Sequence, residues 1–149
     1  MRLSEFDRMP VVGVAMTPFP YAVGPDASVL EVEQLMEEHS IRHVPVQEDG
    51  RVLGIVSERD LHHLVHAALP SGDKRRLRVR HLLLPDPYVV EMTTPLAAVC
   101  REMAVRHIGS AIVLRHGRLA GVFSAVDACR LLGDFLEDRF HPGKPVGAA

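Results

Sequence analysis

The sequence has few of the residues that build disulfide frameworks or membrane spans. Its 149 residues contain no tryptophan, 5% aromatic residues and two cysteines, Cys100 and Cys129, in no metal-ligand spacing. Because two cysteines cannot form a disulfide framework, we expect both to be small core residues. No apolar run approaches the roughly 18 residues of a membrane span, and residues 1–10 lack the apolar stretch of a signal peptide. We therefore expect a cytoplasmic protein.

Strong charge of either sign is also missing. The formal net charge is −2 and the pI is about 6.5, which argues against a dedicated nucleic-acid binder because such proteins normally carry a basic face. The one basic stretch, KRRLRVR at 74–80, falls in an expected linker. We interpret it as a solvated loop, with contact to a phosphate or an acidic partner as the alternative. Hydrophobic residues are plentiful, at 47% of the chain, enough for one core or two half-sized cores that share an interface.

The sequence repeats itself at a distance of 67 residues. The register runs without a gap from Val12 on Val79 to Leu64 on Leu131, and it matches glycines, prolines, tyrosines and aspartates. Chance does not hold one register over that length, so we infer a duplication. The expected organisation is an N-terminal segment at 1–11, a first motif at 12–66, a linker at 67–78, a second motif at 79–133 and a C-terminal tail at 134–149.

Each motif is predicted to contain the same elements in the same order. An extended proline-containing segment leads into a helix with a 3.6-residue apolar period, capped by Asp26 or Ser28 in the first motif and starting at Thr94 in the second. Two β-rich runs follow around a tight turn that contains glycine, and a second helix begins at Ser57 and at its counterpart. The order strand, helix, strand, strand, helix, written twice, predicts a mixed α/β (α+β) fold. Residues 134–140 are compatible with a short amphipathic helix.

A Gly-x-x-Ser-x-x-Asp motif closes each repeat where the last strand meets the last helix. A strand that turns into a helix leaves backbone N–H groups free to bind phosphate, and an aspartate in the first helical turn can accept hydrogen bonds from both hydroxyls of a ribose. The glycine permits close approach of a ligand or a neighbouring strand. The same pattern is typical of a capping box that binds nothing, and both interpretations stay open. The first corner comprises Gly54, Ser57 and Asp60, and the second comprises Gly121, Ser124 and Asp127.

The two corners differ in the groups around them. Arg59 stands between the serine and the aspartate of the first corner, where the second has Val126. Arg42 and His43 add positive or donor character near the first corner, whereas a glycine and a serine occupy their places in the second repeat. Thr17 supplies a hydroxyl before a proline in the first repeat, where the second has a leucine. We therefore expect one stronger site and one that is weak, different or empty.

The segments AMTPFP, SIRHVPV and GRVLGIVSERDL, in that order and echoed in the second repeat, closely resemble the cystathionine-β-synthase (CBS) domain family. The resemblance extends from about Val12 to about Gly133. It implies two βαββα motifs packed sheet against sheet as a pseudo-twofold pair, the Bateman module, which commonly assembles into a homodimer. It also implies an adenine nucleotide (AMP, ADP or ATP) or another adenosyl ligand such as S-adenosylmethionine in the cleft between the motifs.

The function implied by this resemblance is a stand-alone regulatory sensor that transmits ligand binding to an unknown protein target in trans. Such a module requires no cofactor and is not an enzyme, and no catalytic constellation in the sequence indicates otherwise. A ligand-independent dimeric scaffold is the alternative. The expected ligand contacts are Ser57, Arg59, Asp60, Ser124, Asp127, Thr17, Arg42, His43, Val44 and Pro45.

Nine histidines raise the alternative of a metal-binding CBS protein. His62 and His66 lie four residues apart on a predicted helix, and His39 and His43 lie four apart where a helix gives way to a strand. Two imidazoles one helical turn apart can share a zinc ion. No cysteine or third histidine joins either pair at a recognisable spacing, so we expect solvated or interface histidines and no metal site.

Overall fold

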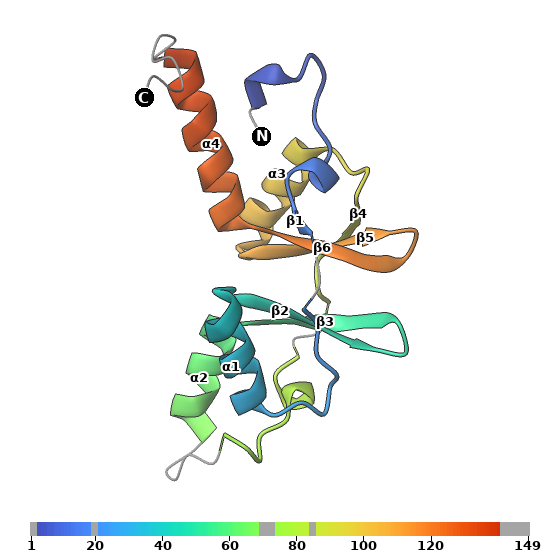
Figure 1. Cartoon of the computed structure of the whole chain (residues 1–149), viewed down its shortest axis with the longest axis vertical. Coiled ribbons are helices and arrows are strands. Elements are labelled where there is room, and N and C mark those ends of the chain that lie inside the picture. Colours follow the sequence, from blue (N-terminus) through green and yellow to red (C-terminus); the bar gives the residue numbers. More distant parts are fainter. Residues whose placement is uncertain (1–2, 19–20, 69–73, 84–85, 141–149) are drawn as a thin grey trace.

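Two layers of β-sheet, each with helices on its outer side, make up the fold (Figure 1). The computed structural model describes residues 3–18, 21–68, 74–83 and 86–140, and of Ser4 and residues 64–68 it describes the backbone alone. Linker residues 69–73, Leu84 and the tail from residue 141 onward, all singled out in the sequence, lie outside the described residues. The helices are α1 (Val29–His39), α2 (Glu58–Ala68), α3 (Leu96–Arg106) and α4 (Ala125–Phe140), and the short 3-10 helices are η1 (Leu3–Glu5), η2 (Val12–Val14) and η3 (Val79–His81). The strands are β1 (Thr17–Pro18), β2 (His43–Glu48), β3 (Arg51–Ser57), β4 (Val89–Glu91), β5 (Ser110–Arg115) and β6 (Arg118–Ser124).

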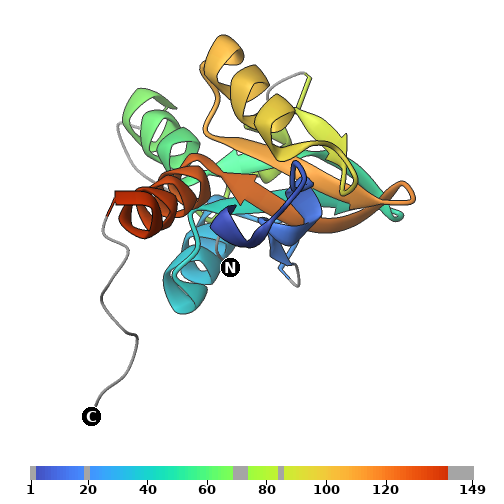
Figure 2. The same cartoon turned by 90° about the horizontal axis from the view of Figure 1, so that it is seen from above.

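The two sheets come from the two repeats. The first is the antiparallel pair β2–β3 with α1 and α2 outside, and the second has the order β1-β6-β5-β4 with α3 and α4 outside. Strands β3 and β6 contact each other, and the hairpins β2–β3 and β5–β6 point in the same direction (Figure 2). Each hairpin turns on a residue pair with positive φ, Asp49–Gly50 and His116–Gly117, as the glycine-containing turns predict. The predicted mixed α/β order is confirmed.

Each repeat buries its leading segment in the core of the other. Val12 and Ala15 pack with residues of α3, β5, β6 and α4, and β1 pairs antiparallel with β6. Reciprocally, Val79 and Leu82 pack with residues of α1, α2, β2 and β3. Neither core is complete without a segment from the other half of the sequence, so we expect the two motifs to fold as one unit.

The start of α1 decides between the two predicted caps. Ser28 is the N-cap, and it forms a capping box with Glu31, whose N–H donates to Ser28 Oγ at 3.2 Å. Asp26 instead forms an ion pair with Arg80, with Oδ1 and Nη2 2.6 Å apart. Asp26 therefore ties the leading segment of the second repeat to the first motif.

Two predicted elements are shorter than the sequence suggests. Helix α3 begins at Leu96 and not at Thr94, because Pro95 occupies the N-cap in an extended conformation (ψ 129°). In the first motif, the leading strand is reduced to one parallel bridge between Val23 and Val46, whereas its counterpart in the second motif is the strand β4.

The last helix is longer than predicted. Residues 134–140 continue α4 and do not form a separate helix. Cys129 lies exposed on α4 while Cys100 is partly buried, so the prediction that both are core residues is wrong for Cys129. The helix buries the face that carries Asp127 and Leu131 instead. None of the described helices, α4 included, has the length and apolar character needed to cross a membrane.

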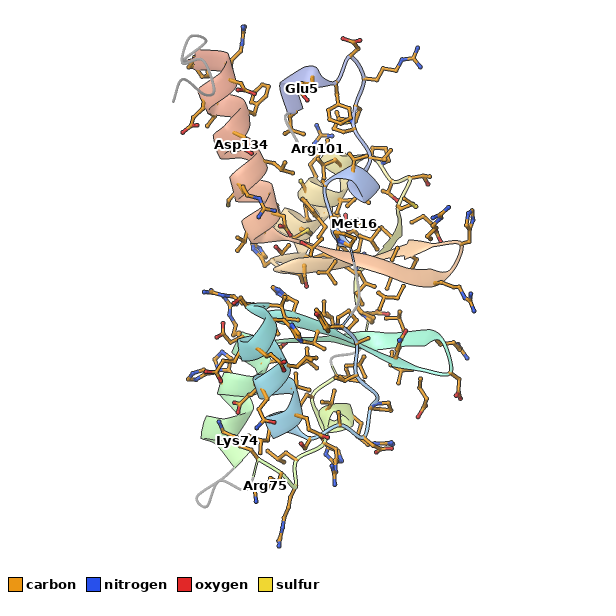
Figure 3. All side chains as sticks on the ribbon, in the orientation of Figure 1. Glu5, Met16, Lys74, Arg75, Arg101 and Asp134 are labelled. Carbon is orange, nitrogen blue, oxygen red and sulfur yellow. The ribbon has the colours of Figure 1, made fainter. Side chains whose placement is uncertain are left out.

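The basic stretch at 74–80 contacts the first motif itself. Lys74 Nζ lies 2.8 Å from Glu33 Oε2 on α1. Figure 3 places Lys74 and Arg75 at the outer end of the first motif, away from the facing sheets. These positions favour the interpretation as a solvated connection over contact with a ligand at the corners.

Candidate functional site

The first corner lies where β3 ends at Ser57 and α2 begins. Asp60 Oδ2 accepts hydrogen bonds from the Ser57 N–H at 2.8 Å and from Ser57 Oγ at 2.6 Å, and the Asp60 N–H donates to Ser57 Oγ at 3.2 Å. This is a capping box, in which each side chain satisfies the backbone amide of the other residue. The β2–β3 ladder places His43 opposite Ser57, so His43 lies beside this corner.

The second corner repeats this geometry and adds an ion pair. Asp127 Oδ2 accepts hydrogen bonds from the Ser124 N–H at 2.9 Å and from Ser124 Oγ at 2.6 Å. Arg130 Nη2 donates to the other oxygen, Asp127 Oδ1, at 2.6 Å. Both carboxylate oxygens are therefore engaged, and only 9% of the Asp127 side chain is exposed.

The two aspartates differ in the hydrogen bonds that they can still accept. Among the described residues, none donates to Asp60 Oδ1, and Asp60 is partly exposed. A carboxylate oxygen has two lone pairs, so Asp60 can accept further hydrogen bonds while its cap stays intact. Capping and ligand binding are compatible at the first corner.

Two arginines and one acid surround the first corner at the surface. Arg42 Nε lies 3.7 Å from Glu58 Oε2, and the two side chains are 75% and 60% exposed, so this pair contributes little to stability. The Glu58 N–H donates to the Arg42 carbonyl at 2.9 Å, which ties the start of α2 to the residue before β2. Arg59 is exposed on α2. Glu58 is missing from the sequence prediction, although its position directly after the corner serine is a signal for it.

Val44 and Pro45, both predicted contacts, point to opposite sides of β2. The Val44 side chain is fully buried in the core of the first motif. Because side chains alternate along a strand, His43 and Pro45 lie on the other face, toward the second sheet. The Val44 side chain thus faces away from any ligand between the motifs.

Thr17 lies in the sheet of the second motif. Strand β1 places it opposite Val122 in β6, the strand that ends at Ser124. It is exposed there. A residue of the first repeat therefore lies beside the strand that leads to the second corner. The exchange of leading segments causes this placement, and the repeat register gives no sign of it.

His43 reaches from the first motif to the second. Its Nε2 lies 3.6 Å from the position that a Cβ would take on Gly109, just before β5. Burial lowers the pKa of His43 below its usual value of 6.5, while the carboxylates of both corners oppose this shift. Among the weaker influences, Arg42 lowers the pKa and Glu58 raises it. The Asp60 and Asp127 carboxylates of the two corners therefore both act on the imidazole of His43.

Acid is expected to destabilise the protein partly through His43. Because burial lowers the pKa of His43 in the folded state, its contribution to stability is fully present above about pH 6.5 and is lost as the pH falls from there through the folded pKa. The His43→Gln variant, which stays neutral, lacks this contribution. Between about pH 8 and pH 5, we expect the free energy of unfolding, measured by urea titration, to fall more steeply for the wild type. Parallel curves would contradict the assignment.

The histidines gather no metal site within the part of the chain that the structure describes. No group of three or more His, Cys, Asp or Glu side chains there is placed to hold a metal ion. His39 instead stacks on Tyr21, with ring centroids 3.7 Å apart. His62 is exposed on α2, and the side chain of His66 lies outside the described residues. The zinc alternative therefore depends on His66 or on a second molecule.

Comparison with known proteins matches both repeats. The family model of the CBS domain matches residues 11–67 and 79–134. Hypoxic response protein 1 of Mycobacterium tuberculosis is 44% identical over 85 residues, which are 57% of this chain and 44% of that protein. This chain spans between 30% and 44% of the lengths of the curated relatives that it matches.

Solved structures share the whole arrangement of two motifs. The CBS domain pair of protein MJ0100, in complex with 5′-methylthioadenosine and S-adenosyl-L-methionine, has a TM-score of 0.75 at 19% identity and covers 85% of this chain and 98% of its own. CBSX2 in complex with AMP has a TM-score of 0.68 at 27% identity, with 83% and 96% covered. Hypoxic Response Protein I with two coordinated zinc ions has a TM-score of 0.69 at 22% identity, with 80% and 97% covered. The predicted pair of βαββα motifs is confirmed.

Proposed function

Because the chain belongs to the CBS domain family, we propose that it is a regulatory module that binds an adenine nucleotide or a related adenosyl ligand between its motifs, mainly at the first corner. Two related structures support this class of ligand, since MJ0100 was solved with 5′-methylthioadenosine and S-adenosyl-L-methionine and CBSX2 with AMP. In this proposal the module catalyses no reaction and transmits binding to a protein target in trans.

The observation that carries the proposal is that one oxygen of the Asp60 carboxylate, Oδ1, is available to accept hydrogen bonds from a ligand. Ser57 holds Asp60 Oδ2 at 2.6 Å and so fixes the carboxylate, while Oδ1 accepts no hydrogen bond from the described residues. A carboxylate fixed in this way can accept both ribose hydroxyls with little further loss of side-chain entropy. Hydrogen bonds to a charged group contribute about 1.5–3 kcal/mol each.

The phosphate of such a ligand would lie at the N-terminus of α2. The amides of Ser57 and Asp60 are bonded within the corner, and the Glu58 N–H donates to a carbonyl just before β2. The Arg59 N–H is therefore the donor of this turn that no described residue engages. The helix dipole and the exposed Arg59 guanidinium favour an anion there. Arg42 would add to this charge by leaving its weak pair with Glu58.

Transmission in this proposal depends on the packing between the motifs. His43 of the first motif lies against Gly109 of the second, and each core contains a segment from the other repeat. A ligand between the motifs would alter this packing, and a homodimer would present the altered surface to the target.

Zinc binding is the second candidate function. The solved structure of Hypoxic Response Protein I holds two coordinated zinc ions, and this chain carries His62 on α2 with His66 one turn later. Zinc therefore belongs in any panel of ligands that is tested.

A thermal-unfolding panel tests the proposal. The purified protein is unfolded alone and with AMP, ADP, ATP, S-adenosylmethionine or zinc, each at millimolar concentration. A ligand present at 100 times its Kd adds about 2.7 kcal/mol, which raises the Tm by roughly 5–10 °C for a domain of this size. We expect such a shift with at least one adenosyl compound. A shift with zinc alone would support the second candidate, and no shift with any compound would support a ligand-independent dimeric scaffold.

A further inference from the structure

We propose that Arg130 closes the second corner to ribose, so that the module binds one adenosyl ligand per chain instead of two. This inference rests on the proposed function and specifies which of its two corners works. It assigns to Arg130 the role of a residue that determines site occupancy, a role that neither the repeat nor the Ser-x-x-Asp motif reveals.

The geometry at Asp127 shows how Arg130 acts. Ser124 holds Asp127 Oδ2 through two hydrogen bonds, as its counterpart does in the first corner. Arg130 takes the remaining oxygen at 2.6 Å, and the Asp127 side chain is left 9% exposed. Arg130 leaves only one lone pair on Asp127 Oδ1, so two ribose hydroxyls could bind this oxygen together only by displacing a charge-assisted hydrogen bond. The carboxylate that would bind the sugar is already paired with a cation and largely buried.

The first corner has no equivalent of this cation. In the 67-residue register, the counterpart of Arg130 is His63, which is exposed on α2. A histidine side chain is shorter than that of arginine, and it lacks the guanidinium fork that matches a carboxylate. No described residue donates to Asp60 Oδ1, and Asp60 is partly exposed. Two corners with the same capping box thus also differ in the residue three positions after the aspartate.

The counterpart residues provide a reciprocal test. Arg130→His gives the second corner the residue of the first, and His63→Arg places the same cation three positions after Asp60. Both positions are exposed, with the Arg130 side chain 64% exposed, so we expect both variants to fold. AMP binding is measured by isothermal titration calorimetry on the full chain, and circular dichroism confirms folding.

We expect the wild type to bind about one AMP per chain, Arg130→His to bind about two, and His63→Arg to bind tenfold or more weakly. Two AMP per wild-type chain would overturn the role of Arg130. So would an Arg130→His variant that binds AMP with unchanged stoichiometry or with lower affinity. Unchanged AMP affinity in His63→Arg would overturn it as well. If the wild type and both variants bind no AMP or other adenosyl compound, the proposed function itself fails. A loss that is confined to one variant is therefore distinguishable from failure of the proposed function.

Discussion

Replacing Asp60 by alanine is expected to weaken AMP binding tenfold or more while lowering the free energy of unfolding by only about 1 kcal/mol. The ribose would lose both hydrogen bonds to a charged acceptor, whereas the fold would lose one capping interaction with Ser57. Binding is measured by calorimetric titration and stability by urea unfolding of the same preparation.

Asp127→Ala is the matched control for this variant. It removes the same capping box from the second corner, with the bonds to Ser124 at 2.6 and 2.9 Å. It should cost similar stability and leave AMP affinity nearly unchanged, because Arg130 already engages the carboxylate. Wild-type affinity in Asp60→Ala would remove the ribose role from Asp60. Equal losses of affinity in both variants would indicate two working corners.

Replacing Gly121 by alanine is expected to destabilise the protein by about 3 kcal/mol, because the new methyl group would overlap the leading segment. A Cβ on Gly121 would collide with the carbonyl oxygen of Thr17 and would lie 2.8 Å from Met16 Sδ. Backbone of β1 would have to move away from β6, and the core of the second motif would lose part of its cover. Urea unfolding of Gly121→Ala measures this loss.

The repeat provides the control for Gly121 as well. Its counterpart Gly54 faces the end of a flexible side chain, with the Cβ position 2.9 Å from Leu83 Cδ2. Leu83 can rotate, so we expect Gly54→Ala to cost less than about 1 kcal/mol. If the two variants were equally stable, the close approach of β1 to β6 would not be a constraint on the fold.

The hairpin turns could be predicted because each depends on residues that are adjacent in the sequence. Asp49–Gly50 and His116–Gly117 both adopt positive φ, and glycine in each pair is the residue that favours this geometry. The capping boxes were predictable for the same reason, since Ser57 and Asp60 lie one helical turn apart.

The exchange of leading segments could not be predicted from the same information. Val12 and Val79 occupy equivalent positions in the repeat register, and either motif could bury either valine. The sequence pattern predicts that these residues are buried, but it does not predict which of the two cores buries each of them. The position of Thr17 beside β6 follows from this exchange.

The preference for the first corner stays a prediction, and the sequence supplies only part of the argument for it. Arg59 and Arg42 favour the first corner from the sequence alone. The ion pair between Arg130 and Asp127 adds a second cause, and pairs at this spacing are too common on helix surfaces to stand out in a sequence.

The most direct test of the proposed site is a 1H–15N chemical-shift titration of the wild-type protein with AMP. We expect saturable shifts that are largest at the amides of residues 57–60, with much smaller shifts at residues 124–127. The absence of saturable shifts at residues 57–60, or larger shifts at the second corner, would contradict ligand binding at the first corner.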